Sequence, residues 1–311
     1  MNRRQFLKSL GILGAGWALS TSPWRSVSAV LAEEQAQAAP VLSVAEGADY
    51  MALVAAVLAP LGGIEAFVKP GHRVVVKPNI GWDRTPEQAA NTHPDVVKGL
   101  VKLALDAGAS QVLVFDRTCN EPRRCYANSG IQAAVESLGD GRARCEFIDD
   151  RKFVPVALDQ GRSLKSFTFY KDALEADCYI NVPVAKHHGS SGLTLALKNT
   201  MGIIGGNRGE IHAALGQRIA DINLALKLHL NVIDATRILL RNGPSGGNLN
   251  DVLVLNTLIA SADPVAADAY ATTLFGLQPW DIESTRAGYE LGLGEMDLSK
   301  VQIVYNKLET V

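Results

Sequence analysis

The sequence predicts an α/β fold with a mostly parallel sheet flanked by helices, and a helical lobe over residues 193–229. Two observations lead to this prediction. Short runs rich in β-branched residues alternate with amphipathic segments along most of the chain, a pattern typical of β-α-β units. Polar clusters also follow several of the runs directly, and ligands of parallel sheets bind at the carboxyl ends of the strands.

The predicted strands are short apolar runs bounded by polar or turn-forming residues. They cover residues 72–76, 111–115, 144–148, 178–182, 232–233, 253–259 and 301–305. Five polar segments fall at strand ends, at residues 77–79, 116–119, 186–188, 234 and 263–264. If the strands are neighbours in one sheet, these segments meet at one edge and form a pocket.

The predicted helices repeat apolar residues every three or four positions, as one buried helix face requires. They cover residues 95–107, 129–138, 193–201, 210–229 and 264–274. Pro94 stands at the first turn of the first of these helices and Gly108 ends it. Asp263 is a predicted N-cap, and Pro264 suits the position after it.

The first 39 residues read as a twin-arginine signal peptide and short linker, ahead of a single α/β domain at residues 40–311. Arg3 and Arg4 precede an apolar run at residues 10–19. This run is shorter than the ~20 apolar residues that a membrane-spanning helix needs. The alternative is an amphipathic cytoplasmic helix. The favoured interpretation predicts the twin-arginine export machinery as a partner, a periplasmic or extracytoplasmic location, and no membrane span in the mature protein.

The overall charge and aromatic content argue against nucleic acid as a partner. The chain has 30 basic and 32 acidic residues, and only 6% of its residues are aromatic. Nucleic-acid-binding domains show a basic surplus, and binders of single strands present aromatic side chains on which bases stack.

The four cysteines follow no ferredoxin or zinc-site spacing. Cys119 and Cys125 lie close together in a polar loop and are predicted to form a disulfide outside the cytoplasm. The alternative is a redox-active or metal-binding pair. Cys145 and Cys178 lie in apolar runs and are predicted to be buried thiols.

The segment AKHHGSSGLTLALKN, residues 185–199, is the strongest candidate site. Lys186 and His188 follow a strand, and a glycine turn leads into a predicted helix whose free backbone amides would attract an anion. Leucines surround Lys198 in sequence, so this lysine is a candidate base or covalent attachment point. The competing interpretation is a surface helix with a snorkelling lysine and capping histidines, and His187 is assigned a structural role.

Three further segments contribute candidates. Lys77 and Asn79 end the first predicted strand and, with Lys186, are assigned to cofactor or anion binding. Arg208 lies in the glycine-rich segment 202–210, which is a candidate phosphate cradle. His93 precedes a predicted helix and is either an acid/base group or a helix cap.

Several of these motifs together resemble the "domain of unknown function 362" family. The resemblance rests on residues 76–79, 92–94, 186–199, 242–244 and 263–269 and spans roughly residues 74–277. Members are often exported by the twin-arginine route, and some carry a ferredoxin-like iron–sulfur module. This sequence has no Cys-x-x-Cys-x-x-Cys run. The family resemblance therefore predicts the fold and the export route, but its activity is not established.

A weaker resemblance is to nickel-pincer lactate racemase. His188 precedes Lys198 by ten positions, as in that family. The resemblance implies that Lys198 tethers a cofactor, that His212 is a metal ligand, and that His93 and His188 accept protons during hydride removal from a 2-hydroxy acid. The sequence differs by lacking a Gly-Gly pair ahead of the lysine and in its spacing to His212.

Together these features predict an exported, cofactor- or metal-dependent enzyme that acts on a small anionic substrate by racemase-like, isomerase-like or redox chemistry. The cofactor is left open between a metal and a covalently tethered group. Two alternatives remain: a non-catalytic anion- or metal-binding or redox accessory protein, and an iron–sulfur protein that uses Cys119 and Cys125.

Overall fold

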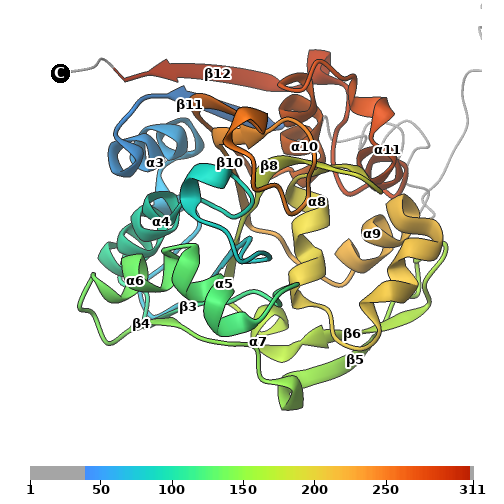
Figure 1. Ribbon diagram of the computed structural model, residues 1–311, viewed down its shortest axis with the longest axis horizontal. Helices are drawn as coiled ribbons and strands as arrows, with labels where there is room; N and C mark the ends of the chain where they lie inside the picture. The colour runs from blue at the N-terminus through green and yellow to red at the C-terminus, as the bar shows by residue number, and fades with distance from the viewer. Residues whose placement is uncertain (1–38, 309–311) are drawn as a thin grey trace, which may run out of the picture. The chain divides into compact units, whose positions relative to one another are not determined.

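The central element of the protein is a mostly parallel β-sheet of ten strands, seen in a computed structural model that describes residues 39–308 (Figure 1). The strand order is β12-β1-β11-β10-β7-β2-β3-β4, and β8 and β9 continue the sheet beside β10. Only β11 and β9 run antiparallel to their neighbours. The predicted fold class is confirmed. The twin-arginine motif lies outside the described residues.

The strands of this sheet coincide with most of the predicted apolar runs. Their bounds are β1 Val41–Glu46, β2 Arg73–Pro78, β3 Gln111–Val114, β4 Ala143–Cys145, β7 Cys178–Val182, β8 Val184–His188, β9 Gly192–Thr194, β10 Leu230–Leu239, β11 Val252–Ser261 and β12 Gln302–Lys307. A separate antiparallel pair consists of β5 Phe153–Ala157 and β6 Ser166–Tyr170.

Helices cover both faces of the sheet (Figure 1). Their bounds are α3 Tyr50–Leu58, α4 Pro94–Asp106, α5 Pro122–Asn128, α6 Ile131–Glu136, α7 Lys171–Leu174, α8 Ala196–Asn199, α9 Leu215–Asn223, α10 Pro264–Thr273 and α11 Glu283–Glu290. Alternation along β2 divides the core: Val74 and Val76 pack with α3, α4 and α6, whereas Val75 packs with β6 and α9. The same alternation puts Lys77 on the α9 side.

The predicted helical lobe at residues 193–229 is the main departure from expectation. Residues 192–194 form β9, which pairs with β8 in a hairpin whose turn covers residues 189–191. Gly192, directly after the turn, has a φ of 75°, which favours glycine. Only the short helix α8 and a 3-10 turn at Thr200–Ile203 follow. The predicted helix 210–229 is a 3-10 helix at Arg208–Ala214 followed by α9, which ends at Asn223.

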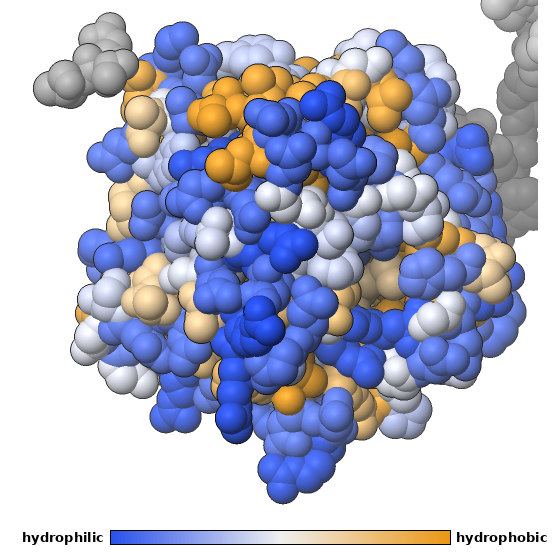
Figure 2. Space-filling view, in the orientation of Figure 1, coloured by the Kyte–Doolittle hydropathy of each residue, from blue (hydrophilic) through white to orange (hydrophobic). Residues whose placement is uncertain are grey.

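The visible surface in this orientation is mostly hydrophilic, with an apolar area near the region where Figure 1 labels β11 (Figure 2). Large exposed apolar side chains at the β10–β11 end include Leu240, Leu249, Leu253 and Val254. None of these four lines the cavity described below. Between residues 39 and 308, no helix has both the length and the apolar character needed to cross a bilayer.

Candidate functional site

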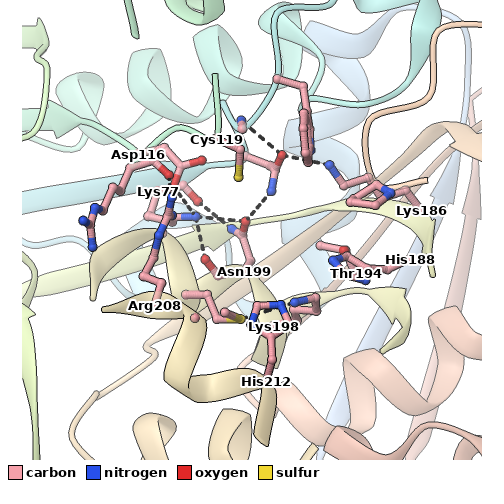
Figure 3. Close-up of a pocket in the computed structure, with 18 residues that line it drawn as sticks. Lys77, Asp116, Cys119, Lys186, His188, Thr194, Lys198, Asn199, Arg208 and His212 are labelled. Carbon is pink, nitrogen blue, oxygen red and sulfur yellow. Dashed lines mark hydrogen bonds and ion pairs between the residues drawn. The ribbon is translucent and has the colours of Figure 1, made fainter. Parts of the chain in front are cut away.

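A cavity of about 380 Å³ lies at the carboxyl ends of β2 and β3, beside the β8–β9 hairpin (Figure 3). Three of the five predicted polar strand ends meet in it, at residues 77–79, 116–119 and 186–188. The lining also includes Thr194, Lys198, Asn199, Met201, Gly202, Arg208 and His212. Asp234 and Asp263 do not line it, because they bind the backbone of neighbouring segments and cap α10, respectively.

One wall of the cavity is a buried ion pair. Lys77 Nζ lies 2.8 Å from Asp116 Oδ1 and donates to both the backbone oxygen (2.6 Å) and Oδ1 (2.9 Å) of Asn199. Burial lowers the pKa of Lys77, and the Asp116 carboxylate opposes that shift. Gly202 is required beside the pair, since a Cβ there would lie 1.7 Å from Asp116 Oδ1.

Lys186 is buried in the opposite part of the lining, and no carboxylate between residues 39 and 308 pairs with it. Only 1% of its surface is exposed, and its Nζ donates to Asn79 Oδ1 and to the backbone oxygen of Ala90. Burial lowers the pKa of Lys186 to about 7. Because both acceptors are neutral oxygens, the positive charge of this lysine is not balanced by the protein around it.

Lys198 on α8 has even weaker hydrogen-bond partners for its ammonium group. It is 8% exposed, and within residues 39–308 the only hydrogen-bond acceptor of its Nζ is Met201 Sδ, at 3.2 Å. A thioether is a weak acceptor. Burial lowers the pKa of Lys198 to about 8. This lysine is therefore a cation directed into the cavity that has no strong acceptor among residues 39–308.

The start of α8 does not offer free amides to a ligand, in contrast to the prediction. The backbone N–H groups of Ala196 and Leu197 donate to the two carboxylate oxygens of buried Asp268 on α10, at 2.6 and 3.1 Å. Burial raises the pKa of Asp268 to about 7. Asp268 thus holds α8 in place, and the charge of the cavity comes from side chains.

The adjacent histidines of β8 lie on opposite faces of the strand, as the two-residue period requires. His188 lines the cavity, whereas His187 Nδ1 accepts a hydrogen bond from the N–H of Gly243. Burial and the nearby charges of Lys198 and Lys186 lower the pKa of His188 to about 3. Its imidazole is therefore neutral, with Nδ1 accepting from the N–H of Ser190.

The structure does not bring His93 to this cavity. His93 caps α4, where its Nδ1 accepts from the N–H of Asp95. Its ring packs edge-on against Tyr50, with the centroids 4.7 Å apart. The acid/base pair of His93 and His188 is thus not assembled here; the second histidine in the lining is His212.

Two arginines border the cavity, and their guanidinium groups already have hydrogen-bond partners. Arg208 donates to the backbone oxygens of Arg117 and Thr118, both at 2.8 Å. Arg117 donates to the backbone oxygen of Ile204 at 2.9 Å. All of these acceptors are neutral, so the arginines add positive charge to the cavity.

The predicted bridge between Cys119 and Cys125 is not formed in this structure. Cys119, Cys125, Cys145 and Cys178 are free thiols. Cys119 lines the cavity, while Cys125 is a buried residue of α5, and burial raises its pKa to about 11. The described part of the chain also contains no group of three or more His, Cys, Asp or Glu side chains arranged for a metal ion, so His212 has no such partners.

The sequence did not single out Asp116, Asn199 or Gly202 as site residues. Asp116 and Asn199 were recognisable only as members of polar segments, and their contacts join residues 36 to 122 positions apart. A polar residue next to a predicted strand end was the available signal for Asp116. No local pattern marks Gly202, whose role depends on the ion pair beside it.

Comparison with known proteins connects the chain to one family and several individual proteins. The family described as "Domain of unknown function (DUF362)" matches residues 74–273. The thylakoid-associated protein sll1697 of Synechocystis is 28% identical over 256 residues, which cover 80% of this chain and 77% of that protein.

Two solved structures are similar at lower levels. A Thermotoga maritima protein shares 12% identity with a TM-score of 0.46, and the lactate racemase apoprotein of Thermoanaerobacterium thermosaccharolyticum shares 12% with a TM-score of 0.45. The matches cover 79% and 76% of this chain. They span only 60% and 57% of those longer chains.

Proposed function

This chain belongs to the DUF362 family, and we propose that it is an enzyme that binds a small anion in the cationic cavity. One observation carries the proposal: the cavity lining holds five cationic side chains and a single carboxylate, Asp116, which is already paired with Lys77. The four remaining cations are Lys186, Lys198, Arg117 and Arg208. None of them has an ion-pair partner in the part of the chain that the structure describes.

An excess of buried positive charge destabilises a protein unless something compensates it. A carboxylate or phosphate in the cavity would supply that compensation. It would also favour the charged forms of Lys186 and Lys198, whose pKa values burial lowers to about 7 and about 8. The volume of about 380 Å³ is in the range of small-molecule sites.

Lys198 is the group best suited to chemistry in this cavity. With a pKa of about 8, it is partly neutral near pH 7.5 and therefore able to accept a proton or to attack an electrophilic carbon. His188 is neutral and adjacent, so it is a second proton-handling group once an anion offsets the charges of Lys186 and Lys198.

The same residues fit a lysine-tethered metal cofactor. Lys198 Nζ lacks a strong partner, and His188 and His212 supply imidazoles to the same cavity. In this arrangement Lys198 would hold the cofactor and one imidazole would ligate its metal. When bound, such a group supplies a hydride acceptor for a 2-hydroxy acid. The remaining cations then hold the carboxylate of the substrate.

Isothermal titration calorimetry of the purified full chain tests anion binding, with L-lactate, L-malate and inorganic phosphate as probes. We expect binding of at least one anion, weakened at least tenfold by Lys198→Met. Lys102→Met is the matched control, since Lys102 is exposed on α4 and far from the lining. Equal affinity of Lys198→Met and the parent chain, or no binding of any probe, would contradict the proposal.

Catalysis is separated from simple anion binding by hydrogen exchange. Incubation of the bound 2-hydroxy acid in D₂O, followed by polarimetry and mass spectrometry, detects racemisation and solvent exchange at its C2 carbon. Intact mass of the native protein reveals a covalent group on Lys198. Anion binding without turnover, exchange or adduct would instead identify a non-catalytic anion-binding accessory protein.

We also propose export of the protein by the twin-arginine route. The support is the Arg3-Arg4 pair followed by the short, glycine-interrupted apolar run at residues 10–19. Fusion of residues 1–39 to a reporter protein tests this proposal in cells. Periplasmic reporter that is lost when Arg3→Lys and Arg4→Lys are combined supports it; secretion that is unaffected by these changes contradicts it.

A further inference from the structure

We propose that Cys119 is a nucleophile of this cavity and that the natural ligand is a small anion with an electrophilic carbon, such as a 2-oxo acid. The inference rests on the proposed anion-binding function. It extends that function by assigning a covalent step to a residue whose sequence neighbourhood pointed instead to a disulfide. Three features of the structure support it: the position of the thiol, the state of Lys198 and the charge around both.

Cys119 is held at the cavity by the backbone. It lies beyond the end of β3, and its N–H donates to the backbone oxygen of Gly81 at 2.8 Å. In Figure 3 its side chain is directed toward the space bounded by Lys77, Lys186 and Lys198. It is also the one exposed cysteine of the four, because Cys125 and Cys178 are buried and Cys145 is largely covered. A reagent that enters the cavity therefore meets this thiol.

The second, independent observation is Lys198. The residue is more than nine-tenths buried, its ammonium group points into the same cavity, and within residues 39–308 the Met201 thioether is its only hydrogen-bond partner. Burial lowers the pKa values of Lys186 and Lys198. The thiol of Cys119 and these two lysines line one cavity.

These groups permit a balanced addition without an oxidant or a leaving group. Neutral Lys198 takes the thiol proton of Cys119, and the resulting thiolate attacks the carbonyl carbon of the anion. A sulfur–carbon bond forms while the carbonyl π bond opens. The lysine proton then passes to the new alkoxide oxygen, which regenerates neutral Lys198. The product is a thiohemiketal, and the reverse path releases the anion unchanged.

The charge of the lining selects the class of electrophile. A carboxylate group bonded to the carbonyl carbon would lie against Lys186 or the arginines, while the carbonyl carbon reaches the sulfur of Cys119. A neutral electrophile of the same size gains no such attraction. The cavity is therefore expected to favour charged over uncharged reagents, in contrast to a thiol on an open surface.

Competing alkylation tests this expectation. The full chain is treated with iodoacetate or with iodoacetamide, and the rate at each cysteine is measured by peptide mass spectrometry. The ratio of the iodoacetate rate to the iodoacetamide rate, measured in urea-unfolded protein, is the reference. We expect the iodoacetate-to-iodoacetamide ratio at Cys119 to be at least tenfold higher in the folded protein than in the unfolded protein. Equal ratios in the two states would overturn the proposal.

Variants tie the effect to the cavity. Lys198→Met should lower the iodoacetate rate at Cys119 several-fold more than the iodoacetamide rate, while Lys102→Met leaves both unchanged. NMR with 2-¹³C-pyruvate should show a new thiohemiketal carbon signal that Cys119→Ser abolishes. Absence of that signal from the parent chain would exclude 2-oxo acids. Calorimetry on the parent chain distinguishes the two proposals, since anion binding without an iodoacetate preference at Cys119 overturns only the role of Cys119.

Discussion

Lys77 and Lys198 are both buried lysines in the wall of one cavity, but their surroundings differ. Lys77 is surrounded by the Asp116 carboxylate and two oxygens of Asn199. Lys198 has a single thioether contact within the described residues. Burial lowers the pKa of both lysines, yet only at Lys77 does a neighbouring carboxylate counteract it.

The difference shows how one cavity separates a structural charge from a reactive one. A charge that the protein neutralises contributes to folding and is held in one position. A charge that the protein leaves without a partner is available to a ligand, at some expense of stability. Substitutions at the Lys77–Asp116 end of the cavity should therefore change mainly the stability of the protein. Substitutions at Lys198 should change mainly the binding of a ligand.

The largest effect is expected from Asp116→Asn. The substitution keeps the shape of the side chain but leaves the ammonium of Lys77 buried without its counter-charge. Removal of one partner of a buried pair lowers the free energy of unfolding by about 3–5 kcal/mol. Urea unfolding followed by circular dichroism measures the change, and a loss below about 1 kcal/mol would contradict the structural role given to this end.

Gly202→Ala tests the Lys77–Asp116 end of the cavity by adding a methyl group against the ion pair. A Cβ at this position would meet Asp116 Oδ1 at 1.7 Å and Lys77 Nζ at 2.5 Å, so the ion pair must move. We expect a loss of about 1–3 kcal/mol, typical of overpacking. Gly141→Ala is the control, since a Cβ there has no atom within 4 Å. Equal stabilities of the two variants would show that the pair tolerates displacement.

The pH dependence of stability tests whether Lys198, unlike Lys77, is a buried cation without a counter-charge. The pKa of Lys198 is about 8 when folded and 10.5 as the ordinary value, so the unfolded chain binds more protons between these values. The free energy of unfolding should therefore rise with pH there, by up to about 1.4 kcal/mol per pH unit for this one group. Subtraction of the Lys198→Met curve isolates the contribution, because the buried thiols titrate in both proteins. A zero difference would mean that Lys198 is not desolvated.

The smallest loss of stability is expected from Lys198→Met at pH 7. Methionine fills similar space and removes a buried charge that no carboxylate balances, so the free energy of unfolding should stay the same or rise, by at most about 3 kcal/mol. Thermal unfolding of the variant beside Asp116→Asn measures this. A loss as large as that of Asp116→Asn would remove the distinction between the two lysines.

The sheet was the part of the structure most accessible from the sequence. The runs at β2 and β7 are short, mostly apolar and contain β-branched residues, as is typical of buried strands, and Pro94 and Gly108 bound α4 at both ends. For residues 193–201 the same reasoning gave a wrong prediction at the start of the segment. Their apolar spacing suits a helix, but pairing with β8 makes the first two residues part of a strand.

The candidate site was predictable in its residue types and less so in its arrangement. Lys77, Lys186, His188, Lys198 and His212 were chosen from sequence and share the cavity lining. His93 does not, because a residue ahead of a helix serves equally well as its cap. The partners that distinguish the lysines from one another come from distant segments, and a single sequence contains no record of such contacts.

The way the arginines are held limits how selective the cavity is. The guanidinium groups of Arg117 and Arg208 each use some of their five N–H donors on backbone oxygens, so fewer donors are left to read the shape of a carboxylate or phosphate. The lysine ammonium groups supply the other positive charges, and they act as point charges with freely rotating donors. Such a site discriminates between anions by charge and size more than by detailed shape, so it accommodates a series of related anions. Differences in the reactivity of these anions, more than in their affinity, then decide which one is transformed.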